Sequence, residues 1–246
     1  MNQIQRAVQH LAFSAILLGV ATTTQVSATY AETYIAGQFG VTLPSVLPSS
    51  FDNGLTNANT TGTLGVITQG GAISDQSLQR SILYGGKIGH YFKAVPWLGL
   101  ELEVYNTTPH IKQQAIQFYG PSGLIGETNF TGLNFRVLTV APFNVMFRLP
   151  KTRLQPYIGV GPGIFLARIE DPALTSGNTQ SSTGFGLNAQ AGVRYYITRQ
   201  IALLGEGKFN YTKFSFDETP AGAFNLFGFD ADYKIFHASF GLSVHF

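Results

Sequence analysis

The sequence contains no cysteine among its 246 residues. Disulfides, thiolate metal ligands and a lipid-modified cysteine are therefore excluded. Charged residues make up only 11% of the chain, whereas soluble domains carry about a quarter. The formal net charge of +2 lacks the basic excess that binding to nucleic acid requires, so the composition argues against a nucleic-acid partner.

Long hydrophobic runs are also missing beyond the N-terminal region. No uninterrupted apolar stretch there approaches the ~20 residues that a membrane-spanning helix needs. The chain nevertheless contains 20 phenylalanines and 11 tyrosines, which is difficult to reconcile with a soluble globule of low charge. A closed β-barrel is the other structure that satisfies every backbone polar group inside lipid. The composition therefore favours a membrane barrel.

The N-terminus is typical of an export signal. Arg6 supplies one cation, residues 11–21 are mostly apolar, and small residues follow. Cleavage fits after Ala28 or Ala31, and we favour Ala31. The apolar run is short for a membrane helix, although an N-terminal anchor helix is the alternative. We therefore assign 1–31 to a secretory signal peptide and 32–246 to one barrel domain.

The last eleven residues alternate strictly between two faces, which is the period-two pattern of a strand. A strand with one apolar face and one small or polar face is expected to meet lipid on the first and the barrel interior on the second. The apolar face comprises Phe236, Ala238, Phe240, Leu242, Val244 and Phe246, and the polar face comprises His237, Ser239, Gly241, Ser243 and His245.

Eight alternating segments follow one another, and their connections alternate between short and long. The short ones are 93–97, 149–154 and 198–200, and the long ones are 44–78, 110–130, 171–182 and 217–229. This pattern predicts an all-β, eight-stranded antiparallel up-and-down transmembrane β-barrel with short periplasmic turns and long extracellular loops. The segments are 32–43, 79–92, 98–109, 131–148, 155–169, 183–197, 201–216 and 230–246.

The positions of the charges indicate which face points inward. In 201–216, Glu206 and Lys208 share a face with Asn210, opposite Phe209 and Tyr211. The segments 79–92, 98–109 and 183–197 divide in the same way. A soluble lipocalin-like barrel is also eight-stranded and exported, but its charges would be spread over the outside. We therefore predict a polar lumen and an apolar outer surface.

Six inward-facing charges nearly balance one another and predict a structural charge network in the lumen. Counting residues from the short turns places Lys87 level with Glu103, and Arg194 close to Glu206. Buried ions need counter-ions, and eight strands enclose little more than side chains, so we expect a filled lumen. Surface ion pairs of a soluble barrel are the alternative. The six residues are Lys87, Glu101, Glu103, Arg194, Glu206 and Lys208.

Several motifs, in order, resemble those of the small outer-membrane β-barrel domain family, which groups opacity-type, OmpA-like and OmpX-like barrels. The resemblance covers essentially the whole mature chain and implies the fold and a location in the bacterial outer membrane. It also implies that the assembly machinery reads Phe246. Members include adhesins, structural anchors, narrow channels and a few enzymes, so it implies little about function. The motifs are Phe39-Gly40, Gly-Gly-Lys-Ile-Gly-His-Tyr-Phe at 85–92, Leu-Gly-Leu-Glu-Leu-Glu at 98–103, Asn144 four residues before Arg148, and Pro-Tyr-Ile-Gly-Val-Gly-Pro-Gly at 156–163.

One pair of residues leaves an enzymatic interpretation open. His237 and Ser239 resemble the His-x-Ser of the outer-membrane lipid A deacylase, in which histidine activates a serine nucleophile. The sequence departs from that motif at Phe240, where the deacylase family has asparagine, and no acidic partner can be assigned. Both side chains are also expected to face the lumen. We therefore expect no catalytic residue and interpret the pair as a polar layer beside Lys208.

The sequence contains no pattern for a metal or a cofactor. The histidines at 90, 110, 237 and 245 fall on different strands, faces and a loop, without the spacing of metal ligands. We therefore expect neither metal nor cofactor.

The long loops are the expected carriers of function. They are rich in Gly, Asn and Thr, which suits contact with polysaccharide, lipopolysaccharide headgroups or a partner protein. We expect a monomeric, non-enzymatic surface-interaction or structural protein, with a narrow channel as the alternative. Its expected partners are outer-membrane lipid, lipopolysaccharide and the barrel-assembly machinery. Deletions within 53–74 are expected to leave stability nearly intact.

Overall fold

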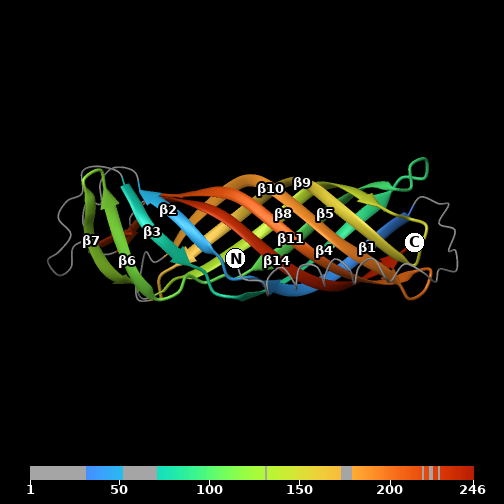
Figure 1. Cartoon of the computed structure of the whole chain (residues 1–246), viewed down its shortest axis with the longest axis horizontal. Coiled ribbons are helices and arrows are strands. Elements are labelled where there is room, and N and C mark those ends of the chain that lie inside the picture. Colours follow the sequence, from blue (N-terminus) through green and yellow to red (C-terminus); the bar gives the residue numbers. More distant parts are fainter. Residues whose placement is uncertain are drawn as a thin grey trace, which may run out of the picture.

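The computed structural model describes residues 32–51, 71–130, 132–172, 179–217, 219–221, 224–226 and 228–246, so the expected signal peptide at 1–31 lies outside the described residues. Within these ranges no helix is long and apolar enough to cross a membrane. Eight long antiparallel strands wind around the long axis of the molecule (Figure 1). They are β1 (Glu32–Thr42), β4 (Ser81–Tyr91), β5 (Leu98–Thr107), β8 (Asn134–Arg148), β9 (Leu154–Glu170), β10 (Thr179–Tyr196), β11 (Ile201–Phe216) and β14 (Phe229–His245).

The first and last strands close the barrel. β1 pairs with β4 on one side and with β14 on the other, from Tyr34 opposite His245 to Thr42 opposite His237. The eight strands are ordered around the barrel as they are in the sequence. The structure therefore confirms the predicted eight-stranded antiparallel up-and-down barrel.

The connections define two ends of the barrel. The short connections follow β4, β8 and β10, at the end where Thr33 and Phe246 exchange backbone hydrogen bonds of 3.1 and 3.0 Å. We call this the turn end and the opposite end the loop end. The strand limits differ from the predicted ones by a few residues, most clearly at β10, which begins at Thr179 because its pairing with β9 continues to Glu170.

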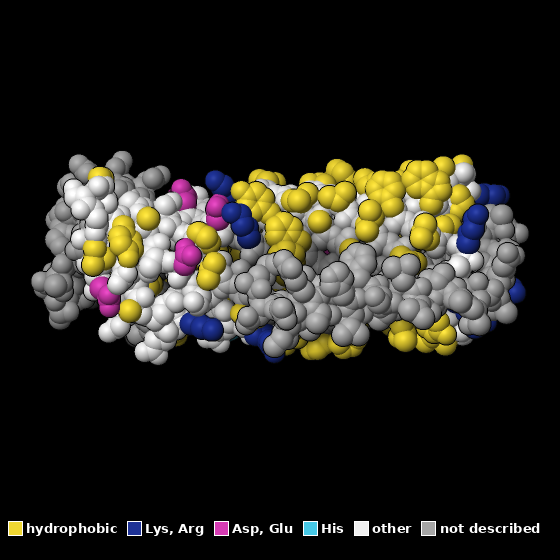
Figure 2. All heavy atoms as spheres, viewed as in Figure 1, with side chains coloured by type: hydrophobic (Ala, Val, Ile, Leu, Met, Phe, Trp, Pro, Cys, Tyr) yellow, Lys and Arg dark blue, Asp and Glu magenta, His cyan; other side chains and the backbone are white. Residues whose placement is uncertain are grey.

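Side chains alternate between the lumen and the outer surface as the sequence predicts. On β11, Glu206 and Lys208 are buried, and on β14, Phe236 and Phe240 are 58% and 64% exposed. Figure 2 shows apolar side chains gathered over the barrel, away from the loop end. A continuous apolar band of this kind would be unfavourable in water, so it marks the surface that meets lipid.

The two faces exchange polarity near the loop end. On β14, Asp230 and Asp232 point outward while Tyr233 and Ile235 are buried inside. The interior there is an apolar core, a departure from the polar lumen face expected along the strands. The reason is that the strands extend beyond the apolar band, where water covers the outer face. The core includes Val137, Phe165, Phe214, Phe216, Phe229, Ala231, Tyr233 and Ile235, together with Phe135, Ala167 and Ile169.

Parts of the long connections fold as further strands, which the sequence does not predict. β2 (Val46–Phe51) pairs with the loop end of β14, where Ser50 faces Asp230. The sheet continues through β3 (Gly71–Ser77), β6 (Gln114–Gly120) and β7 (Gly123–Phe130), and β6 and β7 stand at the loop end in Figure 1. We call β2, β3, β6 and β7 the outer sheet. β12 (Thr219–Ala221) and β13 (Phe224–Leu226) form a separate hairpin.

Short strands of this kind are marginal alone and are stable only when paired. The outer sheet buries Leu47, Ile73, Ile116 and Phe118 against the apolar core of the barrel. Of the aromatic pair on β6, Phe118 is buried and Tyr119 is 38% exposed.

Candidate functional site

Five charged side chains meet inside the barrel and form what we call the ion-pair layer: Lys87, Glu101, Glu103, Glu206 and Lys208. Lys87 Nζ lies 2.5 Å from Glu206 Oε1 and 3.5 Å from carboxylate oxygens of Glu101 and Glu103. Lys208 Nζ pairs with Glu103 and lies 3.0 Å from Glu206 Oε2. All five side chains are fully buried. The layer thus ties β4 and β5 to β11, on the far side of the lumen.

The layer brings together five of the six predicted charges. Lys87 faces Glu103 in the register of β4 and β5, as predicted from the sequence. The closest contact of Lys87, however, is with Glu206 from β11. Counting residues along neighbouring strands does not reveal this contact, because it crosses the lumen.

Neutral polar groups complete the contacts of the carboxylates. Gln190 Nε2 donates to Glu101 Oε1 at 2.5 Å, and Gln190 Oε1 accepts from Lys208 Nζ at 2.9 Å. The Tyr34 hydroxyl donates to Glu101 Oε2 at 2.5 Å. The remaining contacts are donation from Gln38 Nε2 to Glu103 and from the Tyr157 hydroxyl to Glu206. These bonds hold the carboxylates in one arrangement, as a connected buried polar network does.

Inward glycines make room for the large polar side chains. A Cβ atom on Gly89 would lie 2.4 Å from the Tyr34 ring, and one on Gly192 would lie 2.9 Å from Glu206 Cγ. Both distances are too short for non-bonded atoms. Any side chain at these two positions would therefore displace part of the ion-pair layer.

Arg194 does not form the predicted ion pair. Its register partner on β11 is Leu204, whereas Glu206 faces Gly192. The guanidinium carbon lies 4.1 Å from the centroid of the Tyr34 ring and 5.3 Å from that of Tyr157. Among the described residues, Arg194 Nε and Nη2 have no hydrogen-bond partner. The predicted pair of Arg194 and Glu206 is wrong because counting from the turns ignores the stagger between neighbouring strands.

A second polar cluster at the turn end was not predicted. Glu32 forms an ion pair with Arg148, contacts His245 Nδ1 and accepts a hydrogen bond from the Tyr196 hydroxyl. The guanidinium carbon of Arg148 lies 3.7 Å from the centroid of the Tyr91 ring. Glu32 and Arg148 each lie at the end of a strand, where the sequence does not show whether a side chain turns inward. Their opposite charges on inward-facing positions are the signal that could have found them.

His237 and Ser239 do not form a catalytic pair. His237 Nδ1 lies 2.9 Å from Thr42 Oγ1 and His237 Nε2 lies 2.8 Å from Asn210 Oδ1. Ser239 Oγ instead lies 3.4 Å from a carboxylate oxygen of Glu206. Both side chains are buried in the lumen, so neither reaches lipid. Across the described residues, no group of three His, Cys, Asp or Glu side chains is placed to hold a metal ion.

Phe246 ends the chain on the outer surface at the turn end. It is 67% exposed, and its backbone pairs with Thr33 of β1. The residue predicted to act as the assembly signal is therefore accessible from outside the closed barrel. Its role in assembly stays a prediction.

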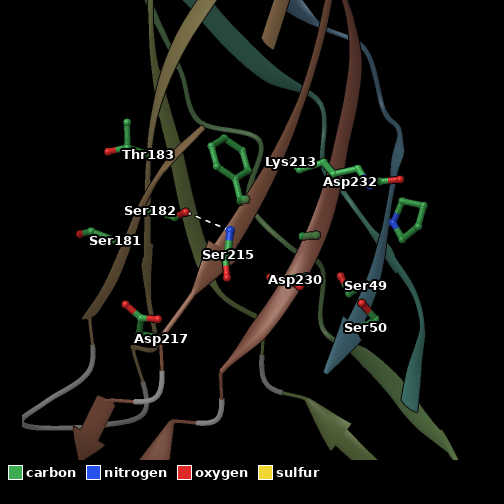
Figure 3. A pocket seen from close by; sticks show the side chains of 13 residues that line it. Ser49, Ser50, Ser181, Ser182, Thr183, Lys213, Ser215, Asp217, Asp230 and Asp232 are labelled. Carbon is green, nitrogen blue, oxygen red and sulfur yellow. Dashed lines mark hydrogen bonds and ion pairs between the residues drawn. The ribbon is translucent and has the colours of Figure 1, made fainter. Parts of the chain in front are cut away.

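An open pocket of about 600 Å³ lies at the loop end between β2, β10, β11 and β14. Six hydroxyl side chains line it, together with Lys213 and the carboxylates of Asp217, Asp230 and Asp232. Figure 3 shows these polar side chains arranged around the space between the strands. The lining suits a ligand that both donates and accepts many hydrogen bonds.

The pocket lies where the backbone hydrogen bonding between β10 and β11 ends. The ladder between β10 and β11 ends at Gly186 and Thr212. Beyond that point side chains bridge the two strands, and the Ser215 N–H donates to Ser182 Oγ at 3.1 Å (Figure 3). Gln180 Nε2 similarly donates to the Asp217 carbonyl at 2.8 Å. Without a backbone ladder, this part of the wall has room for a ligand.

Comparisons with known proteins agree with this architecture. A family model described as the outer membrane protein beta-barrel domain matches residues 12–246. The outer membrane protein OprG of Pseudomonas aeruginosa is similar in structure, with a TM-score of 0.52 and 16% identity over 88% of this chain and 96% of OprG. A likeness at this identity shows the fold alone.

Two other solved structures of similar coverage have lower TM-scores. Ail, the attachment invasion locus protein of Yersinia pestis, was solved with the heparin analogue sucrose octasulfate; its TM-score is 0.40, with 12% identity over 88% of this chain and 99% of Ail. The outer membrane protease OmpT of Escherichia coli has a TM-score of 0.38, with 11% identity over 92% of this chain and 99% of OmpT. No curated protein sequence matches the chain.

Proposed function

Because the chain belongs to the outer membrane protein beta-barrel domain family, whose members reside in the bacterial outer membrane, we propose that it is a surface-interaction protein. It binds hydroxyl-rich ligands such as polysaccharide through its loop end. It neither conducts solutes through the lumen nor catalyses a reaction. The observation that carries this proposal is the contrast between a filled interior and an open polar pocket at the loop end.

The filled interior argues against a channel. The ion-pair layer occupies one part of the lumen, and the apolar core occupies the part toward the loop end. Solutes would have to displace fully buried ion pairs as well as packed aromatic rings. Moving such charges apart without compensation costs several kcal/mol, so a steady open passage is unfavourable.

The pocket supports binding of a saccharide. Carboxylates accept hydrogen bonds from pairs of sugar hydroxyls, and the serine and threonine hydroxyls both donate and accept. Asp230 and Ser181 are exposed at the pocket and point outward from the barrel. The outer sheet flanks this site through β2, so a long polysaccharide could also contact neighbouring strands.

A glycan-binding measurement tests the proposal. The purified barrel is applied to an array of bacterial and host oligosaccharides, beside the double variant Asp230→Asn, Ser181→Ala. Each lost hydrogen bond to a charged group weakens binding by roughly tenfold. Glu127→Gln on β7 removes the same charge outside the pocket and serves as the matched control. Binding of no glycan, or equal binding by the pocket variant, would refute the proposal.

Electrical recordings test the channel alternative. The wild type in planar lipid bilayers is expected to show almost no steady conductance. A large steady conductance would make the protein a channel with the ion-pair layer as its selectivity lining. Disruption of the layer by Glu206→Ala would then change ion selectivity as well as stability.

A further inference from the structure

Cations mark the loop-end border of the apolar band. On five strands or their ends, the last large apolar side chain on the outer face is followed, two residues further toward the loop end, by an exposed Lys or Arg. Figure 2 shows dark blue side chains at this border. The successive pairs are Ile82 and Arg80, Leu138 and Arg136, Leu166 and Arg168, Tyr211 and Lys213, and Phe236 and Lys234.

Two of these cations face each other directly. Arg136 of β8 and Arg168 of β9 are register partners, and the next pair toward the turn end is Leu138 and Leu166. Facing residues on antiparallel strands have Cβ atoms about 5 Å apart, and like charges there are destabilising unless an anion lies between them. Arg136 and Arg168 therefore lie side by side on the outer face, two residues beyond Leu138 and Leu166 toward the loop end.

Neither arginine has a protein counter-ion in the described part of the chain, since no carboxylate there lies within 4.0 Å of either guanidinium group. Arg168 Nη2 donates a hydrogen bond to Thr179 Oγ1 at 3.5 Å. Glu170 lies two residues further toward the loop end, as the register partner of Asn134, and forms no ion pair with either arginine. By contrast, Lys213 and Lys234 lie 3.8 and 3.4 Å from carboxylate oxygens of Asp232.

The charge of Arg136 also acts on a neighbouring residue. Burial, and then the positive charge of Arg136, lower the pKa of His110 below its usual range. His110 lies outside the membrane-spanning strands, in the connection after β5.

We infer that Arg136 and Arg168 together bind a phosphate group of the lipopolysaccharide in the outer leaflet. A planar guanidinium group forms two parallel hydrogen bonds with phosphate, and two adjacent groups can donate hydrogen bonds to three phosphate oxygens. The border of the apolar band is the height at which the acyl chains end and the phosphorylated sugars begin. The site therefore fixes the barrel to its own membrane lipid, separately from the proposed glycan pocket.

Titration with lipopolysaccharide tests this inference. The folded wild type and the double variant Arg136→Gln, Arg168→Gln are titrated in detergent, and Kd is measured. The variant is expected to bind at least about tenfold more weakly, since two sets of charge-assisted hydrogen bonds are lost. Lys234→Gln removes one charge at the same border, where Asp232 compensates it, and is expected to change Kd less than threefold. Equal losses in the two variants would overturn the inference.

Two further arms identify the ligand group and do not depend on the folding of a variant. Lipopolysaccharide whose phosphates have been removed enzymatically should bind the wild type as weakly as intact lipopolysaccharide binds the double variant. Inorganic phosphate alone should compete only at concentrations far above the lipopolysaccharide Kd. Undiminished binding of the dephosphorylated lipid would overturn the inference. Competition by inorganic phosphate at the same concentration as the lipid would also overturn it, because the site would then bind free phosphate.

Discussion

The guanidinium carbon of Arg194 lies 4.1 Å from the centroid of the Tyr34 ring, and the hydroxyl of the same tyrosine donates a hydrogen bond to Glu101. Arg194 thus contacts the ion-pair layer through an aromatic ring. A cation over a buried ring is stabilised by about 2 kcal/mol. The two lysines and three glutamates of the layer leave one negative charge, which Arg194 offsets across Tyr34. The formal charges of the ion-pair layer and Arg194 therefore sum to zero.

Replacing Glu206 by alanine should destabilise the barrel strongly. The change removes one of the two carboxylates that Lys87 and Lys208 share, and breaking a fully buried pair costs about 3–5 kcal/mol. Urea unfolding followed through the single tryptophan, Trp97, measures the loss. Glu170→Ala removes a glutamate that makes no ion pair within the described residues and should shift the midpoint little. An unchanged midpoint in the Glu206 variant would refute the network.

Replacing Ile73 by alanine should loosen the outer sheet without unfolding the barrel. Ile73 is 4% exposed on β3, and truncating a buried isoleucine costs about 2–5 kcal/mol. Limited proteolysis should cut the outer sheet faster, while the urea midpoint of the barrel stays the same. Val46→Ala on β2 is the control, because Val46 is 46% exposed. Equal protease resistance of the Ile73 variant and the wild type would mean that the outer sheet does not depend on this core.

The Ile73 prediction corrects part of an expectation from the sequence. Deletions within 53–74 are expected there to leave stability nearly intact. Residues 71–74 belong to β3, however, which pairs with β2 and β6. Deletions that reach into β3 should therefore weaken the outer sheet. The rest of that segment, up to residue 70, lies outside the described residues.

Deleting Phe246 should lower the yield of folded protein in the outer membrane and leave export unchanged. Phe246 is exposed on the outer surface where β14 meets β1, so its side chain is accessible to the assembly machinery. Fractionation followed by a gel shift between heated and unheated samples measures the folded fraction. Phe246→Tyr keeps an aromatic ring and should retain most of the yield. Full insertion of the truncated chain would show that the terminal residue is not the signal.

Acidification should weaken the connection that carries His110. Its Nδ1 accepts a hydrogen bond from the Phe135 N–H at 3.2 Å, which requires the neutral ring. Because the folded protein lowers the pKa of His110, the stability contribution is present above the unfolded pKa of about 6.5 and is lost as pH falls below it. The protection factor of the Phe135 amide, which is its exchange rate corrected for the intrinsic dependence on pH, should fall between pH 7 and 5. His110→Asn should abolish this fall, and the same fall in that variant would contradict the assignment.

The sequence by itself determined the fold class, the direction in which most side chains point, and the contacts across short turns. Strict alternation separates the two faces of a strand, because neighbouring side chains leave on opposite sides. Lys87 and Glu103 could be paired from the sequence since they lie on two strands joined by a short turn, which sets their register locally. The inward tyrosines and glycines follow from the same alternation.

Only the tertiary structure decided the contacts that depend on the whole ring. Closing the barrel sets the stagger of all eight strands together. No local segment therefore specifies that Lys87 meets Glu206 across the lumen or that Arg194 lies over Tyr34. The outer sheet is another such case, because β2 is held by pairing with β14 near the other end of the chain. The facing arginines, Arg136 and Arg168, also became visible only through the register of β8 with β9.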